Sequence, residues 1–135
     1  MSKEIPQIFN WVKARSECSL ERVFLLFSEV LESDVKTMQG LARSGVLYEQ
    51  TRGERKVVVC RTRDCGGGIK EAEGVVFELV DGAITATAKD ARGNGTQLFK
   101  AKPSLEPNGA CKLEVDGEGL ELWQVSRKAL EPLFF

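Results

Sequence analysis

Residues 20–42 read LERVFLLFSEVLESDVKTMQGLA, and their apolar side chains recur at the spacing of one helix face. The steps are three or four residues long, and their mean is nearer to the ~3.6 residues per turn of a straight α-helix than to the ~3.5 of a coiled coil. Ser19 precedes the segment in the position of a helix N-cap. We therefore expect one long helix whose stripe packs on a sheet. The stripe consists of Leu20, Phe24, Phe27, Leu31, Val35, Met38 and Ala42.

Beyond Gly45 the apolar period changes from that of a helix to the two-residue alternation of strands. The clearest strand pair surrounds Asp81-Gly82, a dipeptide that favours the two-residue type I′ turn of a β-hairpin. That turn fixes the register, because a one-residue slip would send every side chain to the opposite face. The pattern predicts that Leu79 faces Ile84, Phe77 faces Ala86 and Val75 faces Ala88 on one side, with Glu78 facing Thr85 and Val76 facing Thr87 on the other.

A second hairpin is predicted around Arg52-Gly53. A two-residue turn at this point would pair Glu49 with Lys56, two opposite charges, and Leu47 with Val58. Residues 57–60 then read VVVC and are apolar on both faces, which is typical of a strand covered on both sides.

The ends of the chain predict one more hairpin and two further helices. Residues 111–115 alternate in polarity, and a turn at residues 116–119 would bring Leu120 and Leu122 onto the same face. A strand at residues 96–102 precedes this hairpin and is bounded by Pro103. Residues 126–135 predict a short helix ended by Pro132, and residues 5–14 predict another helix with Pro6 in its first turn.

Together these patterns predict an α+β protein: N-terminal helices packed on a curved antiparallel β-meander of about six or seven strands, followed by a short C-terminal helix. A chain of 135 residues has the usual length of one domain. We expect a single domain over residues 1–135, with a helical segment at 1–44, the sheet at 45–125, and a closing helix and tail at 126–135.

The charges of the chain nearly cancel, with 19 basic and 20 acidic residues, so no global field attracts it to nucleic acid or to an anionic membrane. Residues 43–63 are the exception, since they carry a net charge of +4. No apolar run has the length of a signal peptide or of a membrane span, which takes about 20 residues. We expect a cytoplasmic protein with no membrane association and with its cysteines reduced.

The absence of histidine removes the commonest general base and the commonest metal ligand. No catalytic motif is present, and we predict no catalytic residue, cofactor or metal. A zinc site formed by Cys18, Cys60, Cys65 and Cys111 is formally possible, but no Cys-x-x-Cys pair supports it. Whether the protein is an enzyme therefore stays open, and the sequence favours a non-catalytic protein.

Cys60 and Cys65 lie near Arg61, Arg63 and three consecutive glycines, the most unusual local sequence in the chain. Nearby arginines lower the pKa of a thiol, and a glycine loop would let the two sulfur atoms meet. A thiol-based redox protein or enzyme is thus one alternative. The simpler interpretation, which we favour, is that Cys60 ends a core strand and Cys65 begins a loop.

The positive charge of the first hairpin makes a weak nucleic-acid binder a second alternative. Arg61 and Arg63 would contact phosphates, and Tyr48 would stack on a base. Nucleic acid is an unlikely partner, however, because basic residues on one hairpin alternate between its faces and the net charge opposes binding. The other basic residues of this segment are Arg52, Arg55 and Lys56.

Trp123 is predicted on the outer face of the last strand, opposite Leu120 and Leu122. Either the C-terminal segment folds over this indole, which we favour, or the indole forms part of a contact surface. No resemblance to a known family carries functional positions to this chain. The leading hypothesis is a small intracellular binding or protein-interaction module, whose partner is an apolar small molecule, another protein or a second copy of the chain. Its candidate binding residues are Arg61, Arg63, Trp123 and Tyr48.

Overall fold

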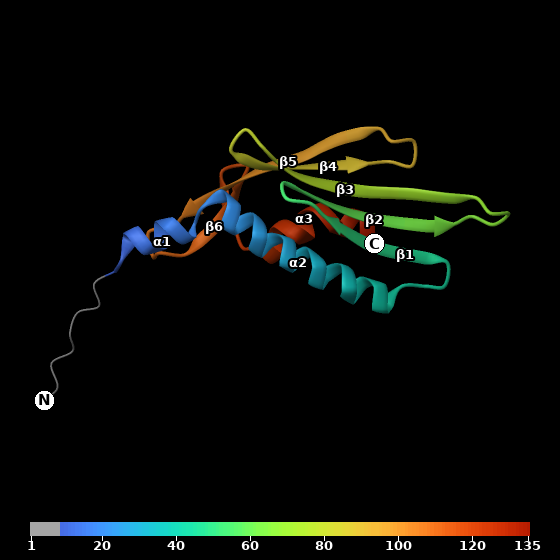
Figure 1. The fold of residues 1–135 in the computed structure, drawn as a ribbon, viewed down its shortest axis with the longest axis horizontal. Coiled ribbons are helices and arrows are strands. Elements are labelled where there is room, and N and C mark those ends of the chain that lie inside the picture. Colours follow the sequence, from blue (N-terminus) through green and yellow to red (C-terminus); the bar gives the residue numbers. More distant parts are fainter. Residues whose placement is uncertain (1–8) are drawn as a thin grey trace, which may run out of the picture.

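A computed structural model describes residues 9–135 and confirms the α+β class (Figure 1). The described strands form one antiparallel sheet in which every strand neighbours the next along the chain, so the sheet is a meander. The elements are α1 (Trp11–Glu17), α2 (Leu20–Leu41), β1 (Val46–Arg52), β2 (Lys56–Asp64), β3 (Lys70–Val80), β4 (Ala83–Lys89), β5 (Gly95–Leu105), β6 (Cys111–Val115), β7 (Glu118–Leu120) and α3 (Leu122–Phe134).

The long helix α2 begins where the sequence predicts, because the Ser19 hydroxyl accepts a hydrogen bond from the backbone N–H of Arg22. Its stripe packs into the same apolar cluster as the inner face of the sheet. The rings of Phe27 and Phe77 meet edge to face, with centroids 5.3 Å apart. Helix and sheet therefore share one core. The α2 residues buried in it are Val23, Phe24, Phe27, Leu31 and Val35.

The β3–β4 hairpin has the predicted register at every pair. Leu79 is opposite Ile84, and Phe77 is opposite Ala86. Asp81 and Gly82 both have positive φ, at 50° and 75°, as a type I′ turn requires. The predicted turn chemistry and side-chain alternation are both confirmed.

The first hairpin, β1–β2, differs from its prediction. Glu49 is opposite Cys60 rather than Lys56, and the turn spans four residues between Arg52 and Val57. The turn is held by the next strand, since the Leu79 N–H donates to the Arg55 carbonyl at 3.0 Å. A contact with a third strand thus overrides the local turn preference.

Strand β2 is covered on one face rather than on both. Val57 and Val59 are fully buried. Val58 and Cys60, which alternate with them and therefore lie on the opposite face, are only half-buried. The expectation of a two-sided strand is therefore wrong, and the apolar outer residues lie at a surface that packing leaves partly open.

The C-terminal segment also differs from its prediction. The turn after β6 takes only Asp116 and Gly117, strand β7 ends at Leu120, and Leu122 begins α3 instead of continuing the strand. Pro132 lies within α3 and does not end it. Strand β5 likewise continues through Pro103, which pairs with Leu113.

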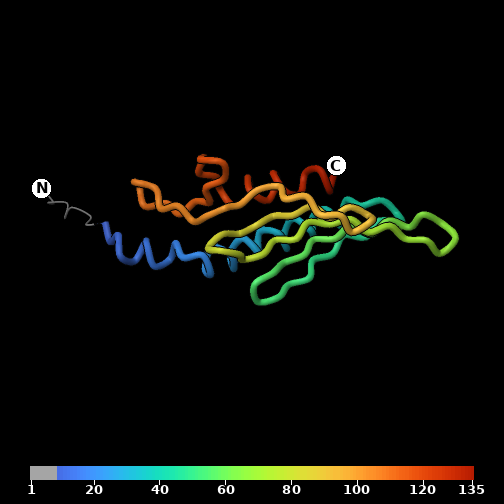
Figure 2. Tube along the Cα trace, turned by 90° about the horizontal axis from the view of Figure 1, so that it is seen from above, coloured from blue at the N-terminus to red at the C-terminus, as the bar shows by residue number. Residues whose placement is uncertain are grey.

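Helix α1 occupies residues 11–17 rather than 5–14, and residues 1–8, including Pro6, lie outside the described residues. None of its residues is buried. Figures 1 and 2 show α1 at one end of the molecule beside β6, with the tip of the β2–β3 hairpin at the opposite end. A disulfide between Cys18, just after α1, and Cys111, at the start of β6, holds this end of the chain to the sheet.

Candidate functional site

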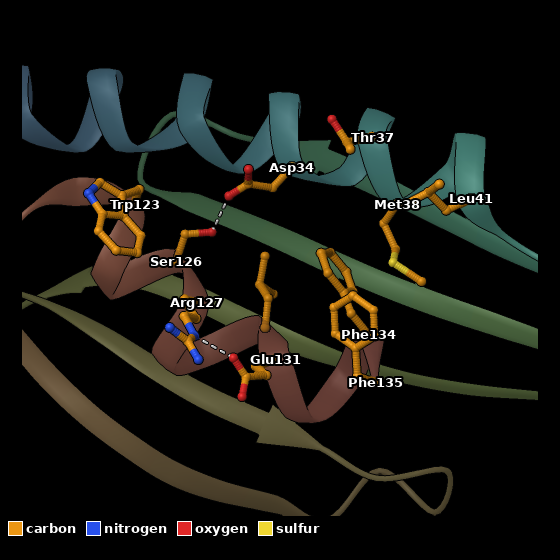
Figure 3. A pocket seen from close by; sticks show the side chains of 11 residues that line it. Asp34, Thr37, Met38, Leu41, Trp123, Ser126, Arg127, Glu131, Phe134 and Phe135 are labelled. Atoms are coloured by element: carbon orange, nitrogen blue, oxygen red, sulfur yellow. Dashed lines mark hydrogen bonds and ion pairs between the residues drawn. The ribbon is translucent and has the colours of Figure 1, made fainter.

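The C-terminal half of α2 forms one wall of an open groove (Figure 3). Asp34, Thr37, Met38 and Leu41 occupy positions i, i+3, i+4 and i+7, so they share one side of the helix. This side is adjacent to the buried stripe but faces α3 rather than the sheet. Met38 is half-buried and Leu41 is 70% exposed. The apolar stripe of α2 therefore runs out of the core and into the groove.

Helix α3 forms the other wall. Its first turn is fixed by Gln124, whose side-chain oxygen accepts the backbone N–H of Glu121 at 2.8 Å. The buried side of α3 joins the core through Val125, Ala129 and Leu133. Four residues at four-residue intervals then form a single row beside it. They are Trp123, Arg127, Glu131 and Phe135.

The groove has a volume of about 270 Å³, close to the lower end of the ~300–1,000 Å³ typical of small-molecule sites. Figure 3 shows that its two ends differ. Met38, Leu41 and Phe134 gather at one end, and Asp34, Ser126 and Trp123 at the other. The groove is thus apolar at one end and both aromatic and polar at the other.

Ser126 and Asp34 form the polar contact between the two walls. Ser126 is 1% exposed, and its hydroxyl donates to Asp34 Oδ2 at 2.5 Å. Because the serine is buried, this hydrogen bond fixes the position of the carboxylate at the groove. An ionised carboxylate has about four acceptor positions, and the hydrogen bonds among residues 9–135 use one of those on Asp34.

Arg127 and Glu131 pair with each other along α3, four residues apart. The hydrogen bond and the charge of Glu131 raise the pKa of the Arg127 guanidinium above its ordinary value. The guanidinium is therefore a permanent cation whose charge is largely balanced by its neighbour. Both side chains are exposed at the rim of the groove.

Trp123 is the one candidate binding residue from the sequence that lines the groove. Its predicted setting is wrong, since it lies in the first turn of α3 and not on a strand. It is also 57% exposed, so the C-terminal segment does not fold over it. The contact-surface alternative fits this position.

Tyr48 lies beneath the groove as a core residue. It is 7% exposed, and its ring meets that of Phe134 edge to face at 5.3 Å. Its backbone N–H, which points away from β2, donates to the side-chain oxygen of Gln39 on α2 at 2.6 Å. A ring this buried has no face for a nucleobase, so Tyr48 acts by supporting the C-terminal end of α3.

Arg61 joins β2 to the last turn of α3. Its guanidinium donates to the Leu133 carbonyl at 2.6 Å and to Glu73 on β3 at 2.8 Å. A cation at a helix C-terminus both satisfies a free carbonyl and complements the helix dipole. Arg63 approaches the same carboxylate at 3.6 Å and is more exposed. These two arginines are therefore engaged in contacts within the fold, although Arg63 is exposed, and the other exposed cations of the hairpin are Arg52, Arg55 and Lys56.

The four cysteines divide into one disulfide and two free thiols. Cys18 and Cys111 are bonded, so the expectation that all four are reduced is wrong for this pair, and so is a zinc site built from all four. The cytoplasmic location that accompanied the expectation stays a prediction. Within residues 9–135, no group of three or more potential ligand side chains is arranged to hold a metal.

Cys60 and Cys65 are separated along the extended end of β2. Five residues at about 3.3 Å each place their Cα atoms roughly 16 Å apart, whereas a disulfide needs less than about 7 Å. Cys60 is half-buried on the outer face, and Cys65 is exposed in the following loop. The two thiols can meet only if the end of the β2–β3 hairpin unfolds.

The polar residues of the groove, namely Asp34, Ser126, Arg127 and Glu131, are not predicted from the sequence. One local signal was present: Glu121 and Gln124 have the spacing of a capping box, which marks a helix start at Leu122. With that start, Trp123, Arg127 and Glu131 fall on one helix row. Their partners on α2 lie some 90 residues earlier in the chain, as in the Ser126–Asp34 contact at a separation of 92, and no local pattern relates them.

Comparison of the chain with models of protein families found no match, and comparisons with curated proteins and with solved structures found no significant match either. In the described part of the chain, none of the helices combines the length and apolar character that crossing a membrane requires. Function is therefore inferred from the groove itself.

Proposed function

We propose that this protein is a non-catalytic binding module whose α2–α3 groove holds a small apolar molecule. The observation that carries this proposal is the groove itself. It is an open cavity of about 270 Å³ with Met38, Leu41, Trp123 and Phe134 on its walls. Covering these partly exposed side chains removes apolar surface from water, which favours binding by roughly 25 cal/mol for each Å².

The polar residues of the groove support binding rather than catalysis. The Ser126 hydroxyl is hydrogen-bonded to the Asp34 carboxylate, but Ser126 is 1% exposed. Arg127 and Glu131 are paired with each other. A nucleophile must be reachable by its substrate and activated by a base, and the buried Ser126 does not meet the first condition.

The test uses the fluorescence of Trp123. The chain contains two tryptophans, so Trp11→Phe leaves Trp123 as the single indole. In this background we expect phenethyl alcohol to change the emission of Trp123 in a saturable way. Leu41→Glu should weaken binding about tenfold or more, because it places a charge in an apolar wall.

Leu25→Glu is the matched control, since Leu25 is an exposed leucine of the same helix, 46% exposed, and does not line the groove. This variant should bind like the parent. Equal affinities for the Leu25→Glu and Leu41→Glu variants would contradict the proposal, as would the absence of saturable binding in the parent.

A second candidate, self-association through the same groove, is favoured by the exposure of its rim. Leu41, Trp123 and Phe135 are 70%, 57% and 88% exposed, and clustered apolar side chains of this kind mark interaction surfaces. Sedimentation velocity over a range of concentrations tests it. A dimer that Leu41→Glu weakens and Leu25→Glu leaves intact would support this candidate. A monomer at every concentration would contradict it.

The thiol alternative makes an opposite prediction to the groove proposal. If Cys60 and Cys65 carry the function, the double variant Cys60→Ser, Cys65→Ser loses it. Both residues lie outside the groove, so the double variant should bind phenethyl alcohol with unchanged affinity if the groove is the site.

A further inference from the structure

We infer that the molecule held by the α2–α3 groove is an apolar compound that carries one positively charged amine. This inference rests on the proposed function and specifies its ligand class. The chemistry that selects such a ligand is a carboxylate without a described cationic partner, placed at the same end of the groove as the indole of Trp123, while the other end is apolar.

The charges of the groove leave one group uncompensated. Arg127 and Glu131 pair with each other, so together they contribute little net charge. Asp34 takes part in none of the ion pairs found among residues 9–135. Its described hydrogen-bond partner is the neutral hydroxyl of Ser126. The net charge of the groove lining is therefore negative and centred on Asp34.

The position of Asp34 is set by the fold rather than by solvent. Ser126 is buried and hydrogen-bonded to the carboxylate across the two helices, so the negative charge is held at the same place before a ligand arrives. A fixed charge needs little reorganisation when its partner binds, which raises the affinity for a partner of opposite sign.

The charge of Asp34 determines which class of ligand the groove binds most tightly. Any molecule that covers the groove displaces water from Asp34, and a desolvated carboxylate without a partner is costly. A ligand without a hydrogen-bond donor bears that cost in full, a neutral hydroxyl offsets part of it, and an anionic ligand adds repulsion to it. An ammonium group replaces the lost water with a charge-assisted hydrogen bond, one of the stronger kinds in proteins.

The aromatic side chains favour the same ligand. Trp123 lies at the Asp34 end of the groove, and Phe134 and Phe135 lie at the other end (Figure 3). The face of an indole attracts cations through its ring quadrupole. A ligand with its amine near Asp34 and Trp123 would extend its apolar part toward Met38 and Phe134.

Three probes of similar shape test the inference: phenethylamine, phenethyl alcohol and hydrocinnamate, which present a cation, a neutral group and an anion on the same phenethyl unit. Affinities are measured at neutral pH from the Trp123 emission of the Trp11→Phe protein. We expect phenethylamine to bind about tenfold more tightly than the alcohol and hydrocinnamate to bind more weakly than both. Added salt should reduce the preference for the amine.

Asp34→Asn removes the charge and keeps an oxygen that can accept the Ser126 hydroxyl. We expect it to lower phenethylamine affinity about tenfold and not to lower the affinity for the alcohol, because the neutral ligand no longer removes water from a charged carboxylate. Glu32→Gln is the matched control, because it removes a carboxylate from the same helix that pairs with Lys36 and lies outside the groove. This control should leave the preference for the amine unchanged.

The outcomes separate the inference from the function on which it rests. Equal binding of the amine and the alcohol, or a preference that survives Asp34→Asn, would overturn the amine inference and leave the apolar groove in place. Failure of all three probes to bind would overturn the proposed function itself.

Discussion

The two halves of α2 carry the same apolar spacing and lie in different environments. In the first half, Phe24 and Phe27 are buried against the sheet. In the second half, Met38 is half-buried and Leu41 is 70% exposed, because the facing element there is α3 and a gap remains between the helices. Apolar spacing therefore predicts which face of a helix is apolar, but the opposing element decides whether that face becomes core or groove.

The sharpest test of this contrast removes one side chain from each region. Phe77→Ala should lower the free energy of unfolding by about 3–5 kcal/mol, because it deletes a fully buried ring that packs against Phe27. Leu41→Ala should change it by no more than about 0.5 kcal/mol, since the side chain is mostly in solvent. Chemical denaturation measures both. Similar losses for the two variants would show that the groove is as closely packed as the core.

The disulfide extends the comparison to α1, none of whose residues is buried. Replacing both Cys18 and Cys111 with serine should lower the free energy of unfolding by about 2–4 kcal/mol, because the bond closes a long loop of the unfolded chain. Its two cysteines are 93 residues apart in sequence. Denaturation with and without reductant measures the effect. A parent protein whose unfolding midpoint is insensitive to reductant would contradict it.

The smallest expected effect concerns the polar link between the sheet and the groove. Arg61→Met should cost about 1–3 kcal/mol, since it leaves the Leu133 carbonyl without its donor and Glu73 with the longer ion pair to Arg63. Arg63→Met is the control and should cost less than about 1 kcal/mol, because its ion pair is longer and more exposed. Thermal or chemical unfolding of the two variants would decide the order. A larger loss in Arg63→Met would refute the role given to Arg61.

The parts of the fold that could be predicted from sequence are those specified by local chemistry. Asp81-Gly82 sets both the turn and the register of β3–β4, and Ser19 marks the start of α2. The β1–β2 register was not predictable in this way, because its turn is held by Leu79 on a third strand. The end of β7 was misjudged because Leu120 and Leu122 alternate like strand residues, although Glu121 and Gln124 begin a helix.

The candidate site was predicted at one residue, Trp123, and with the wrong backbone around it. The remaining groove residues depend on contacts between α2 and α3, which are distant in sequence. The disulfide has the same character, since nothing in the local sequence of Cys18 indicates Cys111 as its partner. Long-range contacts of this kind follow from the packed fold and are not encoded in short patterns.

The hydrogen bond from the Tyr48 N–H to Gln39 has a consequence for how copies of this protein meet. Strand β1 is an outer strand of the sheet, and outer strands expose backbone groups on which another chain can pair and aggregate. The side-chain oxygen of Gln39 accepts one of these outward groups, the Tyr48 N–H, and the Arg43 carbonyl accepts another, the Val46 N–H. The α2 helix and the loop that follows it thus satisfy part of the edge of the sheet. This disfavours strand-to-strand pairing between molecules in a crowded solution.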